Sequence, residues 1–204
     1  MQNISNIIFD LGGIFISIDY AKTEQAFIDL GVTNFNALYN QHHASNLFEL
    51  LETGKITPPQ FYDGFREISQ LPLTNDEIKN AWNAMLGDFH LQSLEGLLKL
   101  KQRYKIFLYS NTNIIHWDAF NKIFHKQTGL NNFDDYFIKA YYSHDLGFRK
   151  PYPEGFLSIL TEQKLLAHET LFIDDTIKNV EGAAKAGLQT IHLVPPKTIL
   201  DLQL

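Results

Sequence analysis

The chain has no cysteine among its 204 residues, which excludes both a disulfide framework and a thiolate metal site. No apolar stretch approaches the ~18 residues that cross a membrane, and residues 7–9 are too few for the apolar part of a signal peptide. Basic residues are in deficit: 17 Lys and Arg face 23 Asp and Glu, and the formal charge of -6 argues against a nucleic-acid partner. We therefore expect a cytoplasmic protein that binds neither membrane nor nucleic acid.

The first strong pattern is the stretch of residues 6–14, in which three large apolar residues run directly into Asp10 and then reach Gly12 and Gly13. A short apolar run closed by glycine is typical of a buried strand followed by a sharp turn. This pattern predicts that Asp10 lies at the carboxyl end of a strand, the edge where open parallel sheets bind their ligands. Taken alone, it also fits a strand and a turn that happen to contain an aspartate.

The remaining chain divides into two kinds of pattern. From about residue 19 to residue 89 the apolar residues follow helical spacing, and no strand is convincing there. Afterwards, apolar strands at residues 105–111, 137–141, 171–175 and 190–194 alternate with helical stretches, which predicts a parallel sheet with helices on both faces. We predict an α/β fold: a Rossmann-like, doubly wound core of residues 1–15 and 90–204, with residues 16–89 inserted as an α-helical cap over the carboxyl edge of the sheet.

Polar residues follow the predicted strands at the points where they end. Because these ends crowd into one crevice of a doubly wound sheet, we expect residues that are distant in sequence to lie together. Each of them alone has an ordinary explanation, such as a helix N-cap or a solvated turn. All of them at one edge are better explained by one site. The set comprises Asp10, Ser110, Asn111, Lys150, Asp174 and Asp175.

This set of side chains is suited to phosphoryl transfer. Asp10 can attack phosphorus to give an aspartyl-phosphate, and Asp10 and Asp175 can hold Mg²⁺, which prefers oxygen ligands. The metal lets an anionic carboxylate approach an anionic phosphate, and Lys150 can neutralise that phosphate. The equatorial phosphate oxygens can be bound by Ser110, Asn111 and the backbone N–H groups of Gly12 and Gly13.

Four stretches, in this order, resemble the motifs of the haloacid dehalogenase-like (HAD) hydrolase superfamily. They are residues 9–14 (FDLGGI), 108–113 (LYSNTN), 145–151 (DLGFRKP) and 172–183 (FIDDTIKNVEGA). Residues 52–56 (ETGKI) are similar to the cap of the bacterial subgroup typified by α-D-glucose-1-phosphate phosphatase. The resemblance implies an Mg²⁺-dependent phosphatase. Its implied roles are Asp10 and Lys150 as catalytic residues, Ser110 with Lys150 as the phosphate-binding pair, Asp175 and the Gly12 carbonyl as metal ligands, and Asp174 as a supporting or alternative ligand.

One position departs from the superfamily pattern. Most of its phosphatases carry a second Asp two residues after the nucleophile, as general acid to the leaving oxygen, and here that position is Gly12. Losing a general acid slows a reaction by ~10²–10⁴-fold without abolishing it, and the loss is smallest for a weakly basic leaving group such as the anomeric oxygen of a sugar 1-phosphate. A water or a cap residue could substitute, and the sequence does not choose among Asp19, His42, His43 and His116.

Two functions remain open from the sequence. The first is an Mg²⁺-dependent phosphatase acting on a small phosphate monoester, with a sugar 1-phosphate as one candidate substrate. The second is a non-catalytic module that binds a phosphorylated ligand or partner, for which Gly12 is the best support. A signalling receiver domain is disfavoured because its carboxylate pair precedes the phosphorylated aspartate, whereas here the pair comes last. A dehalogenase is disfavoured because it needs no metal, whereas this chain retains the pair Asp174 and Asp175. The cap is expected to close over the cleft, and the oligomeric state is not predicted.

Overall fold

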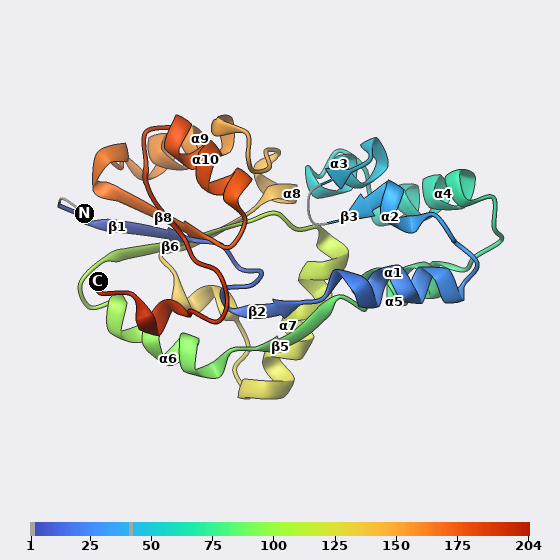
Figure 1. Ribbon diagram of the computed structural model, residues 1–204, viewed down its shortest axis with the longest axis horizontal. Coiled ribbons are helices and arrows are strands. Elements are labelled where there is room, and N and C mark those ends of the chain that lie inside the picture. The colour runs from blue at the N-terminus through green and yellow to red at the C-terminus, as the bar shows by residue number, and fades with distance from the viewer. Residues whose placement is uncertain (1–2, 41–42) are drawn as a thin grey trace.

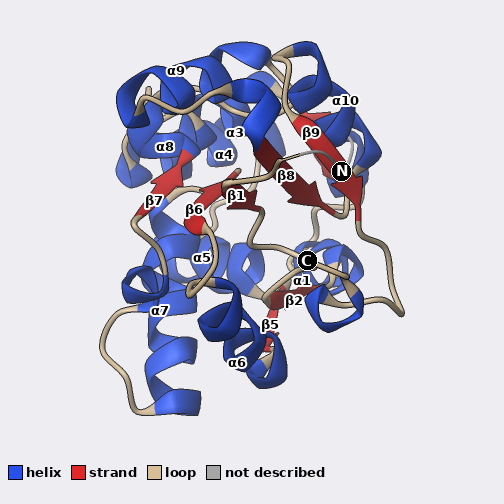
Figure 2. Cartoon of the chain, turned by 90° about the vertical axis from the view of Figure 1, so that its left-hand side faces the viewer, coloured by secondary structure: helices blue, strands red, loops and turns tan. Residues whose placement is uncertain are grey.

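The computed structural model describes residues 3–40 and 43–204, and a five-stranded parallel sheet lies at its centre (Figure 2). The strands are β1 (Asn6–Phe9), β6 (Lys105–Ser110), β7 (Lys139–Tyr142), β8 (Thr170–Asp174) and β9 (Gln189–His192). Their order is β7-β6-β1-β8-β9, so β1 lies in the middle and later strands add on both sides. The register aligns Phe9 with Leu108 and with Ile173, which brings the carboxyl ends of three strands to the same edge.

Successive residues of the central strands point to opposite faces of the sheet, and helices cover both faces (Figure 1). Helices α6 (Leu91–Leu100) and α7 (Ile114–Thr128) pack with Ile7 and Phe9 on one face. Helices α9 (Pro153–Gln163) and α10 (Ile177–Lys185) pack with Ile8 on the other. A strand buried on both faces has a continuous apolar sequence without alternation, as β1 does. The predicted doubly wound, Rossmann-like α/β fold is confirmed.

An insertion leaves the core after β1 and returns to it before α6. The strands β2 (Ile16–Ile18) and β5 (Leu86–Phe89) pair antiparallel at its base. Its helices are α1 (Tyr20–Asp29), α2 (Phe35–Leu38), α3 (Asn46–Glu52), α4 (Pro58–Ser69) and α5 (Asn75–Asn83). They surround a second cluster of buried aromatic side chains, among them Phe27, Phe48 and Trp82, and Figure 1 shows them to the right of the sheet. Ile115 of α7 also belongs to this second cluster, so the packing does not separate the insertion from the core at residues 16 and 89. That domain division stays a prediction.

The expectation of no strand between residues 19 and 89 is wrong. That stretch holds β3 (Tyr39–Asn40), β4 (His43–Ala44) and β5. A two-residue strand is too short to show a period of two, and β5 contains a glycine and an aspartate, which are poor strand formers. The remaining short elements are α8 (Ser143–Leu146) and the 3-10 turns η1 (Phe133–Tyr136), η2 (Ala167–Glu169) and η3 (Ile199–Asp201). Within the described ranges, every helix is too short or too polar to span a membrane.

Candidate active site

Asp10 follows β1 directly and lies at the carboxyl edge of the sheet, as predicted. Its backbone N–H donates to the Ile173 carbonyl at 2.9 Å, so pairing with β8 fixes the point where its side chain leaves the sheet. Asp174 ends β8 and Asp175 follows it. One carboxylate oxygen from each of these three aspartates lies within 4.8 Å of the others. The sheet register thus assembles a carboxylate cluster from residues that are far apart in the sequence.

Lys150 is the cation of this cluster. Its Nζ lies 2.6 Å from Asp10 Oδ1 and 2.7 Å from Asp174 Oδ2, and the residue is 1% exposed. Asn111 holds the lysine backbone, because its Nδ2 donates to the Lys150 carbonyl at 2.9 Å and its Oδ1 accepts from the Lys150 N–H at 2.8 Å. The Asn111 side chain therefore positions Lys150, and a direct contact of Asn111 with phosphate stays a prediction.

The two adjacent aspartates differ in their surroundings. Asp174 is fully buried and accepts hydrogen bonds from the Thr176 N–H at 2.8 Å and from Asn179 Nδ2 at 3.0 and 3.1 Å, in addition to Lys150. Asp175 is partly exposed and accepts a side-chain hydrogen bond from the Thr176 hydroxyl at 3.1 Å. Asp174 thus orients Lys150, whereas Asp175 lines the cavity and remains partly exposed there.

Gly13 is needed where the loop after β1 meets Asp175. It has a φ of +70°, and a Cβ at this position would lie 2.2 Å from Asp175 Oδ2. Its N–H donates to the Ile16 carbonyl at 2.9 Å, so this amide is used within the loop and is not free for phosphate in this arrangement. The predicted roles of Gly12 in binding phosphate and metal stay predictions.

The electrostatics of the cluster favour an added cation. Burial raises the pKa of Asp10 to about 8; Lys150 opposes this rise, and the charges of Asp174 and Asp175 add to it. Burial would lower the pKa of Lys150, but Asp10 and Asp174 outweigh it and raise that pKa well above its usual value. Burial and Asp174 also raise the pKa of Asp175. One ammonium therefore does not fully compensate three clustered carboxylates, a condition that favours a further positive charge.

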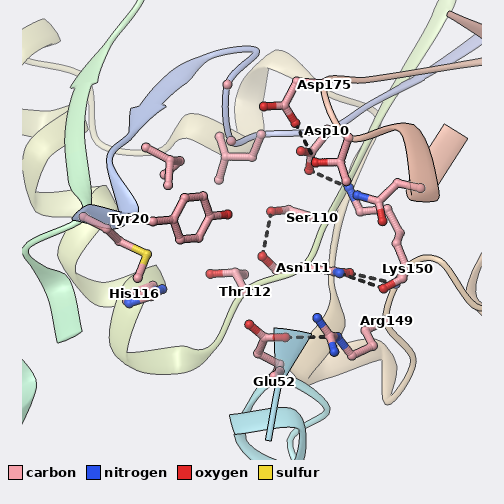
Figure 3. A pocket seen from close by; sticks show the side chains of 18 of the residues that line it. Asp10, Tyr20, Glu52, Ser110, Asn111, Thr112, His116, Arg149, Lys150 and Asp175 are labelled. Carbon is pink, nitrogen blue, oxygen red and sulfur yellow. Dashed lines mark hydrogen bonds and ion pairs between the residues drawn. The ribbon is translucent and has the colours of Figure 1, made fainter. Parts of the chain in front are cut away.

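The cluster opens on a cavity of about 410 Å³ between the sheet edge and the insertion (Figure 3). Ser110 and Thr112 line the cavity from the core side. Further residues that were not predicted for the site also line it, among them Tyr20, Tyr39, Glu52 and Arg149. Arg149 and Glu52 lie inside motif stretches that carried the family resemblance, so that signal was available for them. Tyr20 and Tyr39 lie outside these motif stretches, so no sequence signal pointed to them.

Glu52 of α3 and Arg149 of the core join the insertion to the sheet edge. Arg149 Nε lies 3.0 Å from Glu52 Oε2, and Tyr39 donates its hydroxyl hydrogen to Glu52 Oε1 at 3.0 Å. Burial raises the pKa of Glu52, and Arg149 opposes the rise. Because Arg149 directly precedes Lys150 in the chain, this ion pair ties the end of α3 to the loop that delivers the lysine.

The structure tests the candidates for the missing general acid. Asp19 is exposed and caps α1, where its Oδ1 accepts from the Ala21 N–H at 3.1 Å. His42 and the side chain of His43 lie outside the described residues. His116 lines the cavity but is stacked on Trp82, and its Nε2 lies 3.1 Å from the Trp82 carbonyl. That carbonyl can only accept, so Nε2 carries the hydrogen and donates it away from the reacting atoms. Asp19 and His116 are therefore poorly placed as acids.

His116 gives a pH-dependent contribution to stability. Burial lowers its pKa from 6.5 to about 4, and the bond to the Trp82 carbonyl opposes this shift. Between these values the unfolded chain binds more protons than the folded one, so the free energy of unfolding falls as pH falls. We expect His116 to remove roughly 2–3 kcal/mol of stability between pH 7 and pH 4.5, measured by urea unfolding.

The matched variants isolate that contribution. His116→Gln should lose markedly less stability than the parent over the same pH range. His125→Gln changes an exposed histidine on the same helix and should follow the parent. Equal losses for the parent and His116→Gln would contradict the prediction.

Comparison with known proteins identifies the family. A family model described as haloacid dehalogenase-like hydrolase matches residues 4–187. The D-ribitol-5-phosphate phosphatase of Bacteroides thetaiotaomicron is 33% identical over 191 residues, which cover 93% of this chain and 91% of that protein. The sesquiterpene phosphatase astK of Aspergillus oryzae is 29% identical over 188 residues, which cover 91% of this chain and 88% of that protein.

Solved structures agree with this assignment. The wild-type HAD family enzyme BT-2542 of Bacteroides thetaiotaomicron, in complex with magnesium and inorganic phosphate, matches with a TM-score of 0.87 at 32% identity, covering 98% of this chain and 100% of that chain. A protein of Porphyromonas gingivalis described as a predicted HAD-like family hydrolase matches with a TM-score of 0.86 at 28% identity, covering 96% and 94%. The predicted superfamily and enzyme class are confirmed: the chain belongs to the haloacid dehalogenase-like hydrolase family.

Proposed function

We propose that this protein is an Mg²⁺-dependent phosphatase that hydrolyses a small phosphate monoester through an aspartyl-phosphate on Asp10. The observation that carries the proposal is the contact of one buried lysine with two of three clustered aspartates at the carboxyl edge of the sheet. Two relatives that align over about nine-tenths of the chain are named as phosphatases, which supports the same activity.

The cluster fits a magnesium ion. Its donors are carboxylate oxygens, the ligand type that Mg²⁺ prefers, and Asp10 and Asp175 are the residues that would hold it, with the Gly12 carbonyl as a further predicted ligand. When bound, the ion supplies positive charge that screens the nucleophile from the anionic phosphate. Structures of the relative BT-2542 contain magnesium, which supports the predicted cofactor.

The residues of the chain divide the remaining work. An oxygen of Asp10 attacks phosphorus, the bond from phosphorus to the leaving oxygen breaks, and the phosphoryl group is carried on Asp10 until water hydrolyses it. Lys150 holds the negative charge of the phosphoryl group, and Asp174 and Asn111 hold Lys150 in place. Ser110, at the end of β6, is the proposed hydroxyl donor to a phosphoryl oxygen.

The cavity and the relatives support a substrate class. A cavity of about 410 Å³ with tyrosine, glutamate and arginine side chains in its wall suits a small, hydroxyl-bearing leaving group such as a polyol or a sugar. One relative is named for D-ribitol 5-phosphate, a polyol phosphate. A sugar 1-phosphate is the narrower proposal. A cytoplasmic location, without a membrane or nucleic-acid partner, belongs to the same proposal.

A phosphate-release screen tests this function. Purified protein should release phosphate from at least one polyol or sugar phosphate and from p-nitrophenyl phosphate when Mg²⁺ is present, and release should stop on chelation with EDTA. Binding of phosphate esters without any release across the panel would favour the non-catalytic alternative and overturn the proposal.

A further inference from the structure

The described residues that were candidates for the general acid do not supply a proton donor to the leaving group. Gly12 has no side chain, Asp19 caps a helix, and His116 is neutral with its N–H turned to a carbonyl. Aliphatic alkoxides are strongly basic, so an alkyl phosphate benefits from a donor at the leaving oxygen. A free donor elsewhere in the cavity wall, near the carboxylate cluster, would fill this role.

Tyr20 has the required position. It is the first residue of α1, and Figure 3 shows its hydroxyl projecting into the cavity on the side that faces Ser110. No hydrogen bond joins this hydroxyl to another residue of the described ranges, whereas the neighbouring Tyr39 donates to Glu52. The two rings pack with centroids 6.3 Å apart, which fixes the direction of Tyr20. An oriented, unused O–H therefore faces the cavity that Asp10 also lines.

The charges around Tyr20 keep its hydrogen in place. Burial raises its pKa far above the usual value, and the carboxylates of Asp175, Glu52, Asp10 and Asp174 raise it further. The hydroxyl therefore remains protonated through the working pH range. It becomes a useful acid only when a stronger base forms beside it, and a developing alkoxide is such a base.

We propose that Tyr20 is the catalytic donor to the leaving-group oxygen, in the role that a carboxylic acid plays where Gly12 stands here. The inference rests on the proposed phosphatase function. As the bond from phosphorus to the leaving oxygen breaks, the Tyr20 proton passes to that oxygen and leaves a tyrosinate and a free alcohol. Water then attacks the phosphoryl group on Asp10 and gives a proton to the tyrosinate, which restores both side chains and releases phosphate.

This assignment also selects the substrate class. A phenol of raised pKa protonates an aliphatic alkoxide readily but adds little for an acidic leaving group, which departs without help. The enzyme is thus equipped for esters of aliphatic alcohols, such as polyols and sugars. Hydrolysis of an aryl phosphate does not need the Tyr20 proton, so it serves as a reference reaction for the same enzyme.

The test compares Tyr20→Phe with the parent on two substrates. For a pentitol phosphate, kcat/KM should fall about 100-fold, and for p-nitrophenyl phosphate it should change less than about 3-fold. Tyr62→Phe, which removes a hydroxyl from a cap tyrosine outside the cavity lining, should match the parent on both. Equal losses on both substrates, or no loss on either, would overturn the inference. The parent's Mg²⁺-dependent hydrolysis of p-nitrophenyl phosphate would meanwhile leave the proposed function standing.

A second substitution keeps the hydroxyl and guards against a folding defect. Difluorotyrosine at position 20 loses its proton more readily, so the pH profile for the pentitol phosphate should gain a falling limb at lower pH than in the parent. The profile for p-nitrophenyl phosphate should not move. Identical profiles for parent and fluorinated enzyme on the pentitol phosphate would contradict a donor role for Tyr20.

Discussion

Asp10→Asn is expected to lower Mg²⁺-dependent phosphate release by at least about 10⁴-fold, because an amide oxygen cannot carry the phosphoryl group. The loss should be equal for alkyl and aryl phosphates, since both need the same nucleophile. This uniform loss distinguishes Asp10 from Tyr20, whose removal is expected to discriminate between leaving groups. Phosphate release measured on both substrate types checks the prediction.

The same variant should remain folded. Burial opposes the ionised form of Asp10, so a neutral amide of nearly the same shape removes a charge that the fold disfavours. Lys150 keeps Asp174 as its partner at 2.7 Å. We expect a thermal midpoint no lower than that of the parent near pH 8. Asp118→Asn makes the same change in an exposed pair with Lys122, at the same 2.6 Å separation, and should retain full activity. Parent-like turnover by Asp10→Asn would refute the proposed nucleophile.

The strand ends could be predicted from the sequence because they are local patterns. A run of apolar residues that stops at Asp10, at Ser110 or at Asp174 identifies both the strand and its polar end. The parallel topology then brings those ends together without further information. The family resemblance added the order of the motifs, and the fold agrees with it. The positions of these strand-end residues can therefore be predicted from the sequence alone.

The division of labour within the site could not be predicted in the same way. Asn111 was predicted to bind phosphate and Asp174 to be a supporting or alternative metal ligand, and the sequence did not indicate that both side chains hold Lys150. Tyr20 belongs to no motif. Its orientation depends on packing against Tyr39, which follows it in the sequence after a helix, a loop and a second helix. Such roles arise from tertiary contacts between residues that are separated in the sequence. A linear pattern of residue types does not contain them.

Lys150→Met is expected to destabilise the protein by about 3–5 kcal/mol in the absence of Mg²⁺, because it leaves the buried carboxylates of Asp10 and Asp174 without their cation. For a chain of this length the thermal midpoint should fall by roughly 6–20 °C. Lys122→Met removes a lysine from an ion pair whose side chains are 74% and 60% exposed, and should cost within about 0.5 kcal/mol. Thermal unfolding of both variants with EDTA measures the difference. Equal midpoints for the two variants would contradict a large stabilising contribution from the contacts of Lys150 with Asp10 and Asp174.

Magnesium should then separate the two roles of Lys150. A divalent cation binds the same carboxylates and supplies the positive charge that the variant lacks, so it should raise the midpoint of Lys150→Met more than that of the parent. Activity should not recover with stability, because the ion reaches the carboxylates while the phosphoryl oxygens still lack the ammonium that faced them. A stable, Mg²⁺-loaded and inactive Lys150→Met would mean that the lysine both neutralises the buried cluster and binds the substrate. A variant that regained activity with magnesium would reduce Lys150 to the first role alone.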